Sequence, residues 1–338
     1  MSCQKSPILS ICVPTYNRAY YLKECLDSVI ESAIGTYDDI EIVISDNAST
    51  DNTQEIVENY INNYNFIFYK RNKTNVIDEN FFIAASLAKG EYIWIFADDD
   101  KMEKSAISSV LKYIKQDYNL IICNYSLWDK NFKSIYKKKF YSVSNNVEFN
   151  NHNEILREFG NKLQFLSSIV VKKTTFFNLA EDEYDALHEY GISFAYSLYC
   201  GIVKNVKAVL IAEPLLKYRG NNSPITDTKI WYKYFATGST LLINKLKNKG
   251  YSRNAVYSAK NIVLKQYILH DISLRKRNGE ILSGIFKLIY PYYKNQLLFW
   301  IIAVPMLFSP KLILVIANKI VISLKQVRGF LLFKSIRE

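Results

Sequence analysis

Short apolar runs alternate with helical patterns through the first 125 residues, and this alternation constrains the fold more than any other feature. Between the runs, apolar residues such as Leu22, Leu26 and Val29 recur at helical spacing. Strand and helix in alternation predict an α/β fold, with a mostly parallel sheet and helices on both faces. Strands are predicted at 8–13, 40–44, 66–69, 92–96 and 120–124.

Polar clusters follow three of these predicted strands. They occupy residues 14–17, 45–47 and 98–100. In open α/β sheets the ligand crevice lies beyond the carboxyl ends of the strands. We therefore expect the three clusters to meet at one rim of the sheet.

Three consecutive aspartates, Asp98, Asp99 and Asp100, form the third cluster. Taken alone they fit two descriptions equally well, a solvated turn or a site for Mg²⁺ or Mn²⁺. These hard cations take oxygen ligands, commonly one or two carboxylates together with substrate phosphates. The second description therefore implies a phosphorylated ligand.

The rest of the chain carries fewer signals. Residues 126–164 are polar, and no regular structure is predicted for them. A strand is predicted at 166–173, and a short strand followed by a loop at 213–223. Residues 180–191 are rich in acidic side chains. From Trp231 onward the pattern predicts amphipathic helices packed on the body.

Charge is distributed unevenly along the chain. From Lys229 to the end, 19 Lys and Arg stand against 3 acidic residues, whereas the first 228 residues hold 24 bases and 29 acids. A basic tail on an acidic body indicates a polyanionic partner, either nucleic acid or an anionic membrane.

An uncharged run at 297–308 favours the membrane. It is shorter than the ~20 residues that span a bilayer, and Pro305 interrupts it. Apolar and aromatic residues interleaved with lysines are typical of contact with an anionic leaflet; the alternative is a buried helix with a solvated basic face. The tail carries no recognised nucleic-acid motif. The N-terminus lacks a signal-peptide pattern, so we expect a cytoplasmic protein at the inner face of the membrane.

Three segments, PTYNRAYYLKECLDSV, EIVISDNASTDNT and GEYIWIFADDD, resemble in order and spacing the family 2 glycosyltransferases of the GT-A type. Within that family the chain is most similar to bacterial O-antigen sugar transferases that add a 3,6-dideoxyhexose such as abequose. The resemblance implies a Rossmann-like GT-A domain at 1–225, with nucleotide-sugar binding in 1–125 and the acceptor side in 126–225. A helical, basic, membrane-associating region would follow at 226–338.

Site residues follow from the resemblance, position by position. The family's Asp-x-Asp-Asp pattern is here Ala97-Asp98-Asp99-Asp100, so the first aspartate is absent. Either Asp98 takes over its ribose contact or that contact is lost. Asp99 is the expected metal ligand, with Asp100 as a second ligand or an orienting residue. The expected donor contacts are Pro14, Thr15, Tyr16, Asn17, Asp46, Asn75, Asp78, Asp98 and Arg219. Helix caps, turns and surface charge are the alternatives for Asp46, Asn75, Asp78 and Arg219.

The implied reaction is an inverting sugar transfer, in which a carboxylate takes the proton of the acceptor hydroxyl. Glu189, and then Asp185, are the candidate bases in the acidic stretch. The donor would be a nucleotide sugar, such as a CDP-sugar, and the acceptor a polyprenyl-diphosphate-linked oligosaccharide in lipopolysaccharide synthesis. A UDP-hexose-dependent transferase of capsule or lipooligosaccharide synthesis, and a non-catalytic nucleotide-binding scaffold, remain as alternatives.

Overall fold

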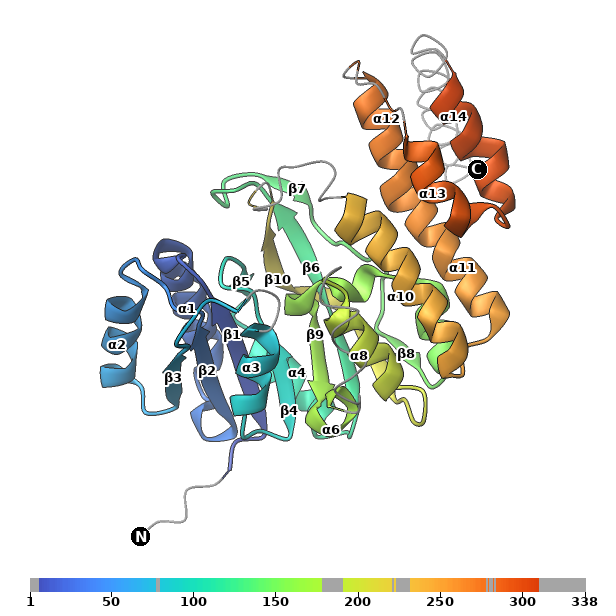
Figure 1. Cartoon of the computed structure of the whole chain (residues 1–338). Helices are drawn as coiled ribbons and strands as arrows, with labels where there is room; N and C mark the ends of the chain where they lie inside the picture. The colour runs from blue at the N-terminus through green and yellow to red at the C-terminus, as the bar shows by residue number, and fades with distance from the viewer. Residues whose placement is uncertain are drawn as a thin grey trace, which may run out of the picture.

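A computed structural model describes residues 6–76, 80–177, 191–220, 222, 232–277, 279, 282 and 284–309. A single sheet runs through the body in the strand order β3-β2-β1-β4-β9-β6-β10-β5 (Figure 1). The strands are β1 Leu9–Thr15, β2 Ile40–Asp46, β3 Ile67–Arg71, β4 Tyr92–Ile95, β5 Lys101–Met102, β6 Leu120–Trp128, β7 Ile135–Lys137, β8 Val147–Phe149, β9 Ile169–Lys172 and β10 Ala208–Arg219.

The first half of the sheet has the predicted parallel arrangement. β1 pairs in parallel with β2 and β4, and β2 pairs in parallel with β3. β1, β2 and β4 are buried along almost their whole length, as expected for strands covered on both faces. Their carboxyl ends therefore lie at one edge, where the polar clusters follow.

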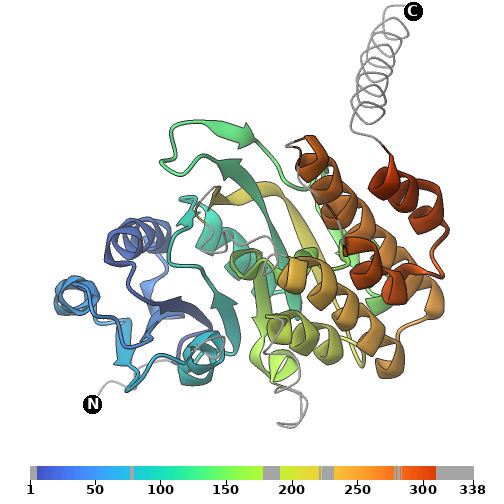
Figure 2. The same ribbon diagram turned by 45° about the horizontal axis from the view of Figure 1, so that its top comes forward.

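Helices cover both faces of this half. α1 (Ala19–Ala33), α2 (Thr53–Asn63) and α4 (Ala106–Ile114) lie on one face, and α3 (Asn80–Leu87) lies on the other (Figure 2). The face of α3 continues into α6 (Lys173–Phe176) and α8 (Ser193–Gly201). Phe82 stacks on Phe176, and Phe81 meets Phe194 edge to face. The helical spacing of apolar residues thus correctly predicts a layer of helices on each face of the sheet.

The second half of the sheet is mixed in direction. β9 is antiparallel to both β4 and β6, β10 is parallel to β6, and β5 is antiparallel to β10. Residues 126–164, read as irregular, contain β7, β8 and the helix α5 (His152–Phe159). The strand expected from residue 213 begins earlier, at Ala208, and bends at a bulge near Pro214.

The described residues of the C-terminal part, from 232 to 309, are mainly helical, as predicted. It comprises α10 (Ser239–Leu246), α11 (Arg253–Val263), α12 (Leu269–Arg277), α13 (Ile285–Tyr293) and α14 (Val304–Phe308). α10 packs on α8 and α11 on α5, while α12 to α14 extend away from the sheet (Figure 1). Within the described ranges, no helix combines the length and apolar character needed to cross a bilayer.

Candidate active site

The loop after β1 is joined to the loop after β2. Asn17 adopts a left-handed backbone with φ of 52°, and its N–H donates to Ser49 Oγ at 2.9 Å. The N–H of Thr50 donates back to Asn17 Oδ1 at 2.7 Å. Asparagine tolerates this conformation better than most residues. The loops after β1 and β2 therefore form one continuous rim, on which Tyr16 is exposed.

Asp46 is fully buried at the end of β2, and the protein occupies both of its carboxylate oxygens. Oδ1 accepts from the N–H of Ser49 at 2.8 Å, and Oδ2 accepts from Tyr69 Oη at 2.7 Å. Arg71 Nε lies 3.5 Å from the same Oδ2. These contacts hold the loop after β2 in place, and they do not support the expected contact of Asp46 with the nucleotide-sugar donor.

The amide of Asn47 anchors the segment that follows β3. Its Nδ2 donates to Asn75 Oδ1 at 2.5 Å and to the carbonyl of Val76 at 3.1 Å. The N–H of Val76 returns a bond to Asn47 Oδ1 at 2.9 Å. Asn75 thus lies beside the rim as expected, whereas Asp78 falls outside the described residues.

The aspartate turn lies directly against the end of β1. Thr15 Oγ1 donates to Asp98 Oδ2 at 2.7 Å, so the first and third polar clusters meet. Arg18 Nη1 lies 3.1 Å from Asp98 Oδ1 and 2.9 Å from Asp99 Oδ2. Asn222 Nδ2 also donates to Asp99 Oδ2, at 2.7 Å. Asp98 and Asp99 therefore face the rim together.

Asp100 is directed into the protein instead. Its Oδ2 accepts from Ser167 Oγ at 2.6 Å, and its Oδ1 accepts from the N–H of Arg219 at 3.0 Å. Only 1% of the residue is exposed. Of the two roles expected for Asp100, this geometry favours orienting the turn over ligating a metal.

Arg219 is buried beneath the turn, and all three of its side-chain nitrogens are engaged. Nε donates to the carbonyl of Asp99, Nη1 to the carbonyl of Lys130, and Nη2 to Glu24 Oε2, at 2.7, 2.6 and 2.6 Å. The expected contact of Arg219 with a donor diphosphate finds no support here, because the guanidinium serves the turn itself.

Burial raises the pKa of two of the three carboxyl groups. The pKa of Asp98 rises to about 6 through desolvation, which Arg18 opposes and the charge of Asp99 reinforces. Desolvation, followed by the charge of Asp99, raises the pKa of Asp100 to about 8. Close like charges in a buried turn resist simultaneous ionisation, so the turn favours an added cation.

A divalent cation fits Asp98 and Asp99, since both carboxylates already converge on one positive group, Arg18 Nη1. Among the described residues, no three His, Cys, Asp or Glu side chains form a complete metal-binding cluster. Magnesium-type sites commonly use one or two carboxylates and complete the shell with substrate phosphates and water. Two carboxylates would leave the remaining positions of such a shell to those ligands.

Sequence reasoning missed Arg18, Glu24 and Ser167. Arg18 lies in the PTYNR segment, and Ser167 lies within the strand predicted at 166–173, which in the structure begins only at Ile169. Neither position indicates its hydrogen-bond partner in the sequence. The candidate bases Asp185 and Glu189 lie outside the described residues.

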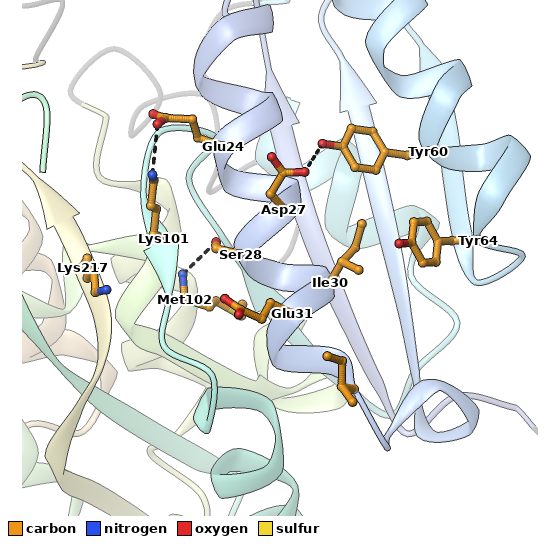
Figure 3. Close-up of a pocket in the computed structure, with 11 residues that line it drawn as sticks. Glu24, Asp27, Ser28, Ile30, Glu31, Tyr60, Tyr64, Lys101, Met102 and Lys217 are labelled. Atoms are coloured by element: carbon orange, nitrogen blue, oxygen red, sulfur yellow. Dashed lines mark hydrogen bonds and ion pairs between the residues drawn. The ribbon is translucent and has the colours of Figure 1, made fainter.

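A separate pocket of about 550 Å³ lies along α1, between α2, β5 and β10 (Figure 3). Glu24, Asp27 and Glu31 line it together with Lys101 and Lys217. Lys101 pairs with Glu24 at 3.0 Å, and Tyr60 Oη donates to Asp27. None of the expected site residues lines this pocket, which approaches the aspartate turn through Glu24.

Comparison with known proteins identifies the family. The family model described as glycosyl transferase family 2 matches residues 10–177. Abequosyltransferase RfbV of Salmonella typhimurium is 31% identical over 280 residues, which cover 77% of this chain and 80% of that protein. The chain belongs to glycosyltransferase family 2. The match to RfbV covers most of both chains, and because it covers 77% of this chain it includes part of the C-terminal helical region.

Two solved structures share the fold of this glycosyltransferase. The crystal structure of S. aureus TarS 1–349 in complex with UDP covers 83% of this chain and 78% of its own, with a TM-score of 0.61 and 15% identity. The mannosyltransferase PcManGT from Pyrobaculum calidifontis, in complex with GDP-Man and Mn²⁺, covers 90% and 88%, with a TM-score of 0.50 and 15% identity. Both likenesses concern the fold alone and confirm the α/β architecture expected from the sequence.

Proposed function

We propose that this glycosyltransferase moves a sugar, with inversion, from a nucleotide-diphosphate donor to a polyprenyl-diphosphate-linked oligosaccharide. The sugar proposed is a 3,6-dideoxyhexose such as abequose, carried by a CDP-sugar and destined for O-antigen. The observation that carries this proposal is the match to an abequosyltransferase over 80% of that protein's length. The convergence of Thr15, Asp98 and Asp99 at the rim supports a donor site there.

Asp99 and Asp98 are the residues proposed to hold a Mg²⁺ or Mn²⁺ ion. When bound, such an ion stabilises the negative charge that develops on the departing diphosphate. The solved structure of PcManGT, which shares the fold, is a complex with GDP-Man and Mn²⁺. Thr15 fixes the direction of Asp98, and Asp100 fixes the turn through Ser167 and Arg219.

A carboxylate from the acidic stretch is proposed to accept the proton of the attacking hydroxyl. Glu189 and Asp185 remain the two candidates. Replacing each with Ala separates an enzyme from a scaffold. An enzyme should lose turnover while its nucleotide binding stays unchanged, whereas a scaffold would show no turnover to lose.

Peripheral attachment to an anionic membrane is part of the proposal, because a polyprenyl acceptor lies in a bilayer. Leu297, Trp300 and Ile301 lie within about one helical turn and are 66%, 45% and 62% exposed. The exposed lysines Lys287 and Lys294 lie on or directly after α13. Apolar anchors beside lysines are the combination that binds anionic lipid surfaces.

The deciding experiment is calorimetric titration of CDP, UDP, GDP and dTDP, with and without Mn²⁺, into the wild type and Asp99→Ala. We expect Mn²⁺-dependent binding of CDP that Asp99→Ala abolishes. A preference for UDP would instead favour the UDP-hexose alternative. Absence of binding by all four nucleotides would contradict the donor site itself.

A further inference from the structure

Arg18 lies between the carboxylates of two neighbouring aspartates. Its Nη1 is 3.1 Å from Asp98 Oδ1 and 2.9 Å from Asp99 Oδ2, and its Nη2 donates to the carbonyl of Asn222 at 3.3 Å. One nitrogen thus bridges the two side chains that face the rim. A positive group already stands where two carboxylates converge.

Arg18 lies at the N-terminus of α1, where the helix dipole alone would disfavour its positive charge. Arg18 is the N-cap residue of α1, and the first turn of this helix contains no acidic residue. The N-terminus of a helix carries partial positive charge and therefore disfavours a cation. The cap is supplied from elsewhere, by Asp51 Oδ2, which accepts from the N–H of Ala19 at 3.0 Å. Asp98 and Asp99 are thus the charges that hold the guanidinium at this position.

Arg18 is held less firmly than Arg219. The side chain of Arg219 is 2% exposed, and each of its three nitrogens has its own short hydrogen bond. The side chain of Arg18 is 26% exposed, one nitrogen serves both carboxylates, and the bond to Asn222 is long. Arg219 has the geometry of a permanent support, and Arg18 has that of a group that can exchange.

We propose that Arg18 is the counter-cation of the metal-free site and competes with a divalent cation for Asp98 and Asp99. The proposal rests on the proposed function, in which these carboxylates bind the metal together with a donor diphosphate. A cation that arrives alone must displace the guanidinium from both carboxylates. A diphosphate that arrives with the cation offers the guanidinium a new anionic partner, for which its geometry is well suited. Arg18 therefore makes metal and nucleotide bind cooperatively.

Binding of Mn²⁺ alone tests the competition. The spectrum of free Mn²⁺ is followed by electron paramagnetic resonance during titration of the full chain, as wild type and as Arg18→Gln. We expect Arg18→Gln to bind Mn²⁺ about tenfold more tightly, because the cation no longer has to break charged hydrogen bonds. Lys101→Gln is the matched control: its side chain is also 26% exposed, but it pairs with Glu24, so its Mn²⁺ affinity should equal that of the wild type.

The same titration with a saturating nucleoside diphosphate measures the coupling. In the wild type, nucleotide should raise the affinity for Mn²⁺, and in Arg18→Gln this increase should shrink by about the same tenfold factor. Mn²⁺ affinity in Arg18→Gln that is equal to or weaker than the wild-type value overturns the proposal.

Two further measurements separate the remaining outcomes. If Arg18→Gln is unfolded without metal, its folding is followed by circular dichroism while Mn²⁺ is added. Refolding on Mn²⁺ addition supports the competition, and a chain that stays unfolded overturns it. A wild type that binds no Mn²⁺ with any nucleotide, while Asp99→Asn behaves identically, contradicts the proposed metal site and with it the competition. Wild-type binding without a gain in Arg18→Gln overturns the competition alone.

Discussion

Arg219→Met tests how far the aspartate turn depends on one buried guanidinium. Methionine keeps an apolar side chain of similar length between Tyr21 and Phe132, whose ring centroids lie 4.8 and 4.2 Å from Arg219 Cζ. The substitution removes the hydrogen bonds to the carbonyls of Asp99 and Lys130 and the ion pair with Glu24. The backbone N–H that binds Asp100 remains.

The magnitude follows from the burial of the partners. Breaking a buried ion pair from one side costs ~3–5 kcal/mol. Glu24 is 29% exposed, so water can replace part of what it loses. We therefore take the lower end and expect Arg219→Met to reduce the free energy of unfolding by ~3 kcal/mol.

Urea unfolding, followed by the fluorescence of the tryptophans, measures this loss. Lys101→Met is the control, because Lys101 pairs with the same Glu24 from a position that is 26% exposed. Both members of this pair are partly exposed to water, so it should contribute about 1 kcal/mol. The reasoning is refuted if the two variants lose the same free energy, since burial would then not distinguish the two cations.

Three further predictions concern pH, membrane binding and helix packing. Burial raises the pKa of Asp100 to about 8, so between about pH 4 and about pH 8 the folded chain holds a proton that the unfolded chain releases. The Tm measured in EDTA should therefore fall across this range, and Asp100→Asn should flatten the fall. Leu297→Ser combined with Ile301→Ser should abolish flotation with vesicles containing anionic lipid, whereas Tyr257→Ser, which changes an exposed side chain on α11, should leave flotation intact. Gly201→Ala should cost ~3 kcal/mol or more in urea unfolding, because its Cβ would lie 1.8 Å from a backbone carbonyl of α6; wild-type stability would contradict this packing.

The strands of the first half could be predicted because each is a continuous apolar run between helical patterns. The directions of later strands could not, since β9 is antiparallel to its neighbours through contacts that no local pattern records. β5 has only two residues, Lys101 and Met102, which is too short for any periodicity. α5 was missed because the polar residues around its buried Ile155 and Leu156 resemble those of a loop.

In the candidate site, too, some contacts could be predicted from the sequence and others could not. The meeting of Thr15 with Asp98 followed from strand ends that share one edge. The inward direction of Asp100 did not, because Ser167 and Arg219 lie 67 and 119 residues away along the chain. Adjacent carboxylates look equivalent in a sequence, and only their partners show which face the ligand and which support the turn.

The aspartate turn also connects β4 directly to β5, two strands that the sheet order separates by β9, β6 and β10. It leaves β4, which pairs with β1, and enters β5, which pairs with β10 at the end of the strand order. Asp98 is bonded to β1 through Thr15, while Asp100 is bonded to the other half through Ser167 and Arg219. A small rotation of one half against the other would change the spacing of neighbouring carboxylates. Such a rotation would reach Asp98 and Asp99 through the backbone of the turn itself.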